Sequence, residues 1–351
     1  MNPLESELVY PLADTLPASG HTLEVAPGVR WLRMGLPFAL NHINLWLLED
    51  GDGWTVVDCG IANEATRGAW EQVFAQELGG RPIRRVIVTH CHPDHVGLSG
   101  WLCERWQAPL WMTVGEYGFA RMMAAGLPGA DGPAMVPHFR RHGLNDPQLL
   151  AELDARKKYY PSLVPKVPDH FTRLDERYPV RIGTHAWRVI TGTGHSPEHA
   201  ALYCDALGVL ISGDMVLPRI STNTSVFPIE PEMDAVGHFL DSLQKFLPLP
   251  QDTLVLPSHG KPFRGLHRRI AQLQAHHAAR LEEVRAACAT PQSAADIVPL
   301  MFQRELDAHQ LTFAMGEALA HLHRLSDAGE LRRIDGDDGV LRFVRKERSA
   351  A

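Results

Sequence analysis

Residues 86–97 read VIVTHCHPDHVG, an apolar run followed by a turn in which His90, His92, Asp94 and His95 fall within six positions. The apolar run predicts a buried strand, and the residues after Asp94 predict a helix. Several ligand-type side chains held still at a strand end meet the needs of a metal site. The plain alternative is that Asp94 caps the helix and the histidines are incidental surface residues. Histidine with carboxylate but no thiolate suits zinc, manganese or iron, and we expect one of these metals here.

Three later segments have the same local form: an apolar run, a turn of small residues and one ligand-type side chain. They are VITGTGHS at 189–196, VLISGD at 209–214 and LVLPSHG at 254–260, and they contribute His195, Asp214 and His259. Each of these residues, taken singly, is typical of a turn or a helix cap. Together with the first cluster they complete a set of seven candidate metal ligands.

The order of these seven residues resembles that of the metallo-β-lactamase superfamily, over residues 30–262. The resemblance implies an α/β (α+β) fold, a four-layer αββα sandwich with a two-metal site at one edge of the paired sheets. It implies two divalent metal ions, zinc in the first place and iron or manganese as alternatives. The expected ligands are His90, His92 and His195 for one metal, Asp94, His95 and His259 for the other, and Asp214 as the bridge between them.

The resemblance also implies a reaction, in which a metal-bound hydroxide attacks an ester or thioester carbonyl. Two cations held about 3.5 to 4 Å apart need an anionic bridge and can ionise water near pH 7. Asp214 as that bridge and Asp94 in proton transfer are the expected catalytic residues. A bridging aspartate disfavours lactam hydrolysis and favours a branch resembling glyoxalase II thioesterases and lactonases. The alternatives are a mononuclear iron persulfide dioxygenase, an RNA or phosphodiester hydrolase, and a catalytically idle binding module on the same fold.

Three further residues have expected roles around the metals. Asp58 occupies the family's early aspartate position, where it would orient a metal-ligating histidine, or else it is an ordinary turn residue. His199 lies four residues after a candidate ligand and would contact the ligands or serve as a buried structural histidine. Asn44 resembles a position at the mouth of the site, where it would touch substrate, or else it is an ordinary strand-end residue.

The chain is expected to divide into a catalytic domain at 1–262 and a helical, winged-helix-like region at 263–351. Strands are predicted at 29–34, 43–48, 54–58, 85–90, 186–190, 201–204, 208–212 and 253–257. Helices are predicted at 116–125, 147–158, 294–304 and 312–325, followed by a hairpin that turns at 336–339. The stretch 113–180 is interpreted as a helical lid inserted in the catalytic domain.

The lid offers candidate substrate contacts. Tyr159 and Tyr160 would meet an acyl chain, and Arg156, Lys157 and Lys158 would hold a phosphorylated handle such as that of coenzyme A. For each residue the plain alternative is an exposed helix face or an ordinary core aromatic.

The composition of the chain limits the classes of partner that we expect it to bind. The 351 residues carry 34 Lys and Arg against 41 Asp and Glu, a net charge of −7, and residues 262–351 hold 13 basic against 12 acidic residues. Nucleic acid is therefore disfavoured and a small ester or thioester is the expected partner. The apolar spacing of 312–325 fits core packing or a homodimer contact. No apolar run is long enough for a membrane helix and no signal segment is evident, so we expect a cytoplasmic protein with its five cysteines reduced.

Overall fold

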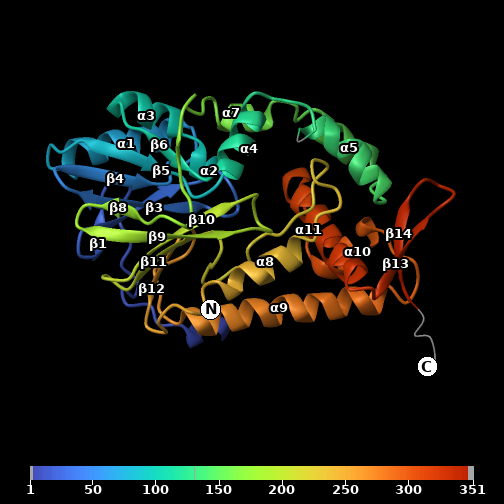
Figure 1. Cartoon of the computed structure of the whole chain (residues 1–351). Helices are drawn as coiled ribbons and strands as arrows, with labels where there is room; N and C mark the ends of the chain where they lie inside the picture. The colour runs from blue at the N-terminus through green and yellow to red at the C-terminus, as the bar shows by residue number, and fades with distance from the viewer. Residues whose placement is uncertain (1–2, 130, 347–351) are drawn as a thin grey trace. The chain divides into compact units, whose positions relative to one another are not determined.

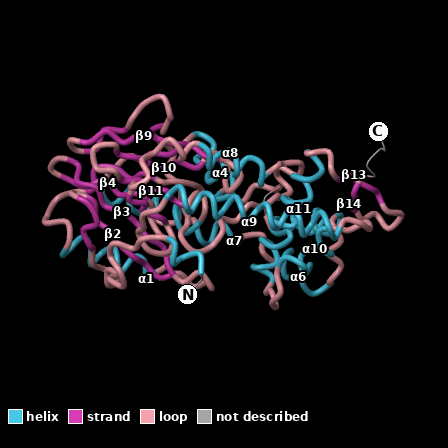
Figure 2. The backbone as a smooth tube through the Cα atoms, turned by 90° about the horizontal axis from the view of Figure 1, so that it is seen from below, coloured by secondary structure: helices cyan, strands magenta, loops and turns pink. Residues whose placement is uncertain are grey.

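The computed structural model describes residues 3–129 and 131–346, and the chain forms two compact units. Unit 1 comprises Met1–Ala125, Tyr160–Thr222 and Ser242–Ile270, and unit 2 comprises Gly126–Tyr159, Asn223–Asp241 and Ala271–Ala351. Strands dominate unit 1, whereas unit 2 is helical apart from β13 and β14 (Figure 2). These boundaries differ from the expected ones at 113–180 and 262. The middle of the predicted lid and a segment near residue 230 share a unit with the C-terminal region.

The first sheet of unit 1 has seven strands among the described residues, in the order β1-β2-β3-β4-β5-β6-β7. Figure 1 labels β1, β3, β4, β5 and β6 of this sheet. Neighbours from β1 to β4 are antiparallel, and those from β4 to β7 are parallel. The strands are β1 Leu23–Ala26, β2 Val29–Gly35, β3 His42–Asp50, β4 Gly53–Val57, β5 Ile83–Ile87, β6 Leu110–Met112 and β7 Thr172–Arg173. A short 3-10 helix, Pro3–Glu7, precedes them.

The second sheet has the order β12-β11-β10-β9-β8. Its strands are β8 Val180–Ile182, β9 His185–Gly192, β10 His199–Cys204, β11 Val209–Gly213 and β12 Leu254–Pro257. Because β9 and β11 are both antiparallel to β10, and β12 is parallel to β11, the strands β9, β11 and β12 end at the same edge of the sheet.

The two sheets face each other across a shared core, which confirms the predicted sandwich. Trp31 and Trp46 are cross-strand partners on β2 and β3, and their rings stack with centroids 6.3 Å apart. They share one buried cluster with Val189, Leu202 and Ile211 of the second sheet. Inward residues alternate along each strand, as the two-residue period of a strand requires.

Helices cover the other face of the first sheet. Helix α1 (Glu64–Gln76) is capped by Asn63, whose side chain accepts a hydrogen bond from the Thr66 N–H. The helix predicted after Asp94 is in fact two, α2 (Pro93–Val96) and α3 (Ser99–Trp106), because the backbone leaves helical geometry at Leu98 (φ −95°, ψ 11°). The core beneath them contains Trp70, Val73 and Leu102 from the helices with Leu47 and Val56 from the sheet.

The predicted lid forms four helices, which are divided between the units. They are α4 Val114–Ala124, α5 Gly132–Arg141, α6 Pro147–Asp154 and α7 Tyr159–Leu163. The remaining elements are α8 Ala235–Gln244, α9 Leu266–Ala287, α10 Ala294–Met301, α11 Ala308–Asp327, β13 Leu331–Asp335 and β14 Leu341–Arg345. The predicted C-terminal hairpin is present as β13 and β14.

Unit 2 has its own core. Phe139 of α5 and Leu153 of α6 lie in one buried cluster with Leu319 and Leu322 of α11. The apolar stripe of 312–325 is therefore used for packing within the unit. None of the described helices combines the length and the apolar character that a bilayer crossing requires. All five cysteines are buried and unpaired.

Candidate metal centre

Five of the seven predicted ligands lie where strands end, and the other two, Asp94 and His95, lie in helix α2. His90 and His92 follow β5, His195 lies in the turn between β9 and β10, Asp214 follows β11 directly, and His259 follows β12. Since β9, β11 and β12 end at one edge of the second sheet, their three side chains meet there. The segment after β5 brings the first-sheet ligands to the same edge of the sandwich.

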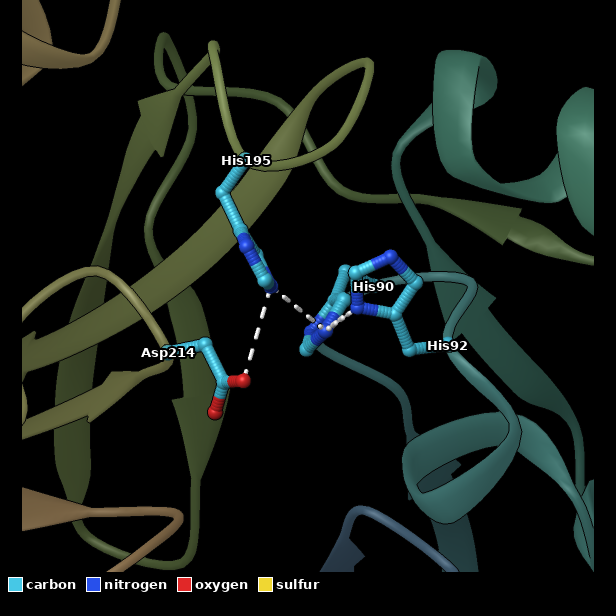
Figure 3. A group of neighbouring side chains, drawn as sticks. All are labelled: His90, His92, His195 and Asp214. Carbon is cyan, nitrogen blue, oxygen red and sulfur yellow. Dashed lines mark hydrogen bonds and ion pairs between the residues drawn. The ribbon is translucent and has the colours of Figure 1, made fainter. Parts of the chain in front are cut away.

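One group consists of His90, His92, His195 and Asp214, whose ring nitrogens and carboxylate point toward one another (Figure 3). His90 Nε2 lies 2.9 Å from His92 Nδ1 and 3.2 Å from His195 Nε2. His195 Nε2 lies 3.4 Å from Asp214 Oδ2. Ligand atoms about 2.0 to 2.1 Å from a tetrahedral metal are about 3.3 Å from one another, so these spacings match those of a metal site.

The second group consists of Asp94, His95 and His259. Asp94 Oδ2 lies 3.7 Å from His95 Nε2 and 3.5 Å from His259 Nε2. The other oxygen of Asp214, Oδ1, lies 3.6 Å from His95 Nε2 and 3.5 Å from His259 Nε2. Asp214 therefore presents one oxygen to each group, which is the arrangement that a bridging ligand needs.

The two groups differ in the direction in which their surroundings shift the pKa values of their histidines. Burial and the neighbouring histidines hold the pKa values of His90 and His92 well below the usual range, so both rings are neutral and carry a free nitrogen lone pair. Burial also disfavours a charged His95, but the carboxylates of Asp94, Asp58 and Asp214 raise its pKa to about 10. Burial likewise disfavours a charged His259, but the carboxylates, Asp214 above all, raise the pKa of His259. Carboxylates in this second group thus favour positive charge, the kind that a divalent cation brings.

Two buried atoms test whether a metal fits. Among the described residues, neither His95 Nε2 nor Asp214 Oδ1 has a hydrogen-bond partner, although both are shielded from solvent. Buried polar atoms without partners are rare because they lose their hydration without compensation. A divalent ion between these atoms would satisfy both, so the residues present fit a metal.

Asp58 lies where the prediction places it, against a ligand histidine. Its Oδ2 accepts a hydrogen bond from His95 Nδ1 at 2.9 Å, and its Oδ1 accepts from the Thr89 N–H at 2.8 Å. This contact fixes the proton on Nδ1 and leaves Nε2 of His95 facing the site. The backbone of Asp58 is left-handed (φ 63°), a conformation that aspartate tolerates better than most residues.

His199 and Asn44 support ligands from behind. His199 Nε2 accepts a hydrogen bond from the Asp214 N–H at 3.1 Å, and burial lowers the pKa of His199 to about 3. Asn44 is fully buried, and its Nδ2 donates to the carbonyls of Pro257 and Gly260 at 2.7 and 3.0 Å. Its amide hydrogens therefore hold the loop that carries His259, and a contact of Asn44 with substrate stays a prediction.

The five candidate lid residues do not all belong to the same unit. Tyr160 belongs to unit 1, and its hydroxyl donates to the Cys91 carbonyl at 2.5 Å, between two ligand histidines. Arg156 and Tyr159 belong to unit 2, where the guanidinium lies 4.9 Å from the centre of the tyrosine ring. Lys157 and Lys158 are exposed and belong to the same unit.

Sequence reasoning missed two residues that hold the ligand loops. His42 accepts a hydrogen bond from His259 Nδ1 at its carbonyl (2.8 Å) and another from the Gly260 N–H at Nε2 (2.8 Å). Glu116 of α4 is fully buried and accepts hydrogen bonds from two loops, one that carries His90 and His92 and one that carries His195. A signal for Glu116 exists, because it shares the buried face of α4 with Ala120 and an acid on an apolar helix face is unusual.

Comparison with known proteins agrees with this geometry. The profile of the Metallo-beta-lactamase superfamily matches residues 40–259, and that of the Metallo-beta-lactamase-like, C-terminal domain matches residues 281–346. The protein named Probable metallo-hydrolase YqjP, from Bacillus subtilis, is 23% identical over 319 residues, which are 83% of this chain and 90% of that protein.

Two crystal structures are similar over nearly the whole chain. A beta-lactamase domain protein from Burkholderia ambifaria is 61% identical, with a TM-score of 0.94 over 98% of this chain and 100% of that one. A metallo-beta-lactamase family protein from Thermus thermophilus is 28% identical, with a TM-score of 0.77 over 92% of this chain and 100% of that one. The chain belongs to the metallo-beta-lactamase superfamily.

Proposed function

We propose that the protein is a metal-dependent hydrolase with a two-metal centre. The observation that carries the proposal is the position of Asp214, whose two carboxylate oxygens each lie within about 3.6 Å of a different ligand group. A single-metal centre would not need an anion placed between two sets of ligands. The relative named Probable metallo-hydrolase YqjP supports the same class of reaction.

The residues divide the work of such a centre. His90, His92 and His195 with Asp214 would hold one metal, and Asp94, His95 and His259 with Asp214 the other. Divalent metals bound there would supply Lewis acidity and ionise water near neutral pH. Asp58 keeps His95 in the tautomer that a ligand needs. The side chain of Asp94 is 18% exposed, so it is the carboxylate of the site best placed to exchange a proton with substrate or solvent.

An ester or thioester is the substrate class we propose, with zinc as the metal. The bridging carboxylate supports the thioesterase-like and lactonase-like side of the superfamily, as the sequence resemblance implies. The near balance of charge in residues 262–351, with 13 basic and 12 acidic side chains, disfavours a polyanionic substrate. Histidine and carboxylate ligands without thiolate suit zinc as well as manganese and iron, and the sequence resemblance implies zinc in the first place.

The test combines metal content with a substrate screen. Protein purified without chelator should contain two metal ions per chain by elemental analysis. It should hydrolyse thioesters or lactones, lose this activity on dialysis against a chelator, and regain it with zinc. One iron per chain with oxygen consumption on a persulfide would overturn the proposal in favour of a dioxygenase, and cleavage of phosphodiesters alone would overturn the substrate class.

A further inference from the structure

Cys91 is the residue between the ligands His90 and His92, and both polar groups of its backbone are held from outside the loop. Its N–H donates to Glu116 Oε2 at 2.8 Å. Its carbonyl accepts from the Tyr160 hydroxyl at 2.5 Å. Glu116 lies 25 residues and Tyr160 69 residues away along the chain, so neither contact belongs to the local turn. Together these contacts leave the Cys91 peptide little freedom to rotate.

The second oxygen of Glu116 reaches the loop of another ligand. Oε1 accepts from the Ser196 hydroxyl at 2.5 Å and from the Glu198 N–H at 2.8 Å. Ser196 follows His195 directly. One carboxylate therefore ties the loop that carries His90 and His92 to the loop that carries His195.

The chemistry of these contacts requires a carboxylate. Glu116 is fully buried, and no ion pair to it is found within residues 3–129 and 131–346. Each backbone group that it meets is a donor: the Cys91 N–H on one oxygen and the Glu198 N–H on the other. A glutamine would turn its NH2 toward one of these N–H groups in either orientation and leave that group unpaired. A carboxylate side chain can accept a backbone hydrogen bond on each of its two oxygens, which a glutamine at this position cannot do.

We propose that Glu116 and Tyr160 are positioning residues, which fix the Cys91 peptide so that His90 and His92 meet His195 before a metal binds. The inference rests on the metal-binding part of the proposed function and not on its substrate. Neither residue is a predicted metal ligand. Their contribution is to limit the motion of the ligands, which lowers the entropy lost on metal binding.

The variants Glu116→Gln and Tyr160→Phe test the proposal, with Asp50→Asn as the matched control. Asp50 is also a buried carboxylate that accepts several hydrogen bonds, from Gly183, Thr55 and Arg85. It ends β3, whereas His42, which holds the His259 loop, begins that strand. Eight residues of extended strand separate the two positions by about 26 Å. Asp50→Asn should therefore destabilise unit 1 without disturbing the ligands.

Zinc affinity of the metal-stripped chain is the main measurement, obtained by competition with a chelating dye. It should fall about 10- to 100-fold in Glu116→Gln, by a smaller factor in Tyr160→Phe, and not at all in Asp50→Asn. The visible absorption bands of cobalt-substituted protein should shift in the first two variants only. Thermal unfolding of all three, followed in parallel, separates loss of stability from loss of positioning.

The proposal is overturned if Glu116→Gln and Tyr160→Phe keep wild-type zinc affinity and cobalt spectra while losing stability as Asp50→Asn does. Should Glu116→Gln fail to fold, Tyr160→Phe decides alone, because it deletes a single oxygen atom and keeps the ring. A wild-type chain that binds two metals but hydrolyses none of the screened substrates would defeat the proposed function and leave the positioning result standing.

Discussion

At the scale of single residues, Asp214 lies next to both candidate ligand groups. It meets His195 with one oxygen and His95 and His259 with the other, and its backbone N–H is held by His199. Burial opposes its charge, yet His259 and His95 lower the pKa of Asp214 well below the usual range. This direction favours the ionised carboxylate, the form that a bridge between cations needs.

The Asp214→Ala variant should retain the fold but lose the two-metal centre. We expect metal content to fall from two ions to one or none per chain, and hydrolysis to fall at least about 100-fold, because the loss of a ligand costs more than the loss of a residue that orients one. Elemental analysis, a hydrolysis assay and circular dichroism would check this. Asp205→Ala, which removes an exposed aspartate paired with Arg188, is the matched control. Two metals and full turnover in Asp214→Ala would refute the bridging role.

The sequence pattern predicted the seven residues that the structure brings together, and it also predicted the contacts of Asp58 and His199 with them, but not the contacts of Glu116 and His42. A ligand reveals itself by its type and by its place after an apolar run, as His195 and His259 do. Glu116 and Asn44 act through contacts with segments 80 or more residues away, at Ser196 and Gly260. No local pattern encodes such pairings, because they depend on how the two sheets come together.

At the scale of elements, β11 and the turn after it show how closely the backbone approaches the site. Gly213, the last residue of β11, has φ 53°, and a Cβ atom there would lie 2.2 Å from His199 Nε2. Glycine is required both by the left-handed backbone and by the close approach of the imidazole. The end of this strand thus sets the position of Asp214 through His199.

Gly213→Ala should lower the unfolding free energy by more than backbone strain alone would. Gly208→Ala is the control, because Gly208 also has a positive φ (61°) but no atom lies within 4 Å of its added Cβ. We expect a loss of about 1 kcal/mol in unfolding free energy for Gly208→Ala and at least about 2 kcal/mol for Gly213→Ala. Only Gly213→Ala should also weaken zinc binding. Equal losses in the two variants, measured by urea unfolding, would show that the contact with His199 carries no cost.

Element prediction followed the strength of each local signal. Strands such as β3 and β4, with continuous buried runs, were placed within a few residues. Helix α5 was missed because Pro133 and Pro137 interrupt its pattern, although a proline is tolerated in the first turn of a helix. The strand predicted to reach His90 ends at Ile87, because the next residues turn toward Asp58 and the ligands.

At the scale of the whole molecule, acid should destabilise unit 2 through its buried histidines. Unit 2 buries several histidines in neutral form. Burial, with neighbouring histidines, lowers the pKa of His142 to about 3, that of His277 to about 3 and that of His321 to about 4. An unfolded histidine has a pKa of about 6.5, so below that pH the unfolded chain binds protons that the folded unit does not. The contribution of these histidines to stability is therefore fully present well above pH 6.5 and is lost as the pH falls toward 4.

Unit 2 should consequently unfold at a lower urea concentration at pH 5 than at pH 7.5. The expected loss is roughly 2 kcal/mol for each such histidine at pH 5. All eight tryptophans lie in unit 1, so tryptophan fluorescence follows unit 1 alone. Helices of both units contribute to helical circular dichroism, so a change in that signal that fluorescence does not share reports on unit 2. His142→Asn should reduce the pH dependence of the helical signal, whereas His170→Asn, at an exposed position, should not. Identical urea midpoints at the two pH values would contradict the assignment.

The interleaving of the units along the chain has a consequence for synthesis. Leu150 and Leu153 share a buried cluster with Leu319 and Phe343, which lie more than 160 residues further along. A ribosome that adds roughly 5 to 20 residues per second needs on the order of 10 to 30 seconds to cover that distance. Throughout this interval the apolar faces of α5 and α6 are outside the ribosome without the helix and hairpin that will cover them. The nascent chain must therefore carry an unburied hydrophobic surface while unit 1 is still being completed, and this stretch is where a chaperone would be needed.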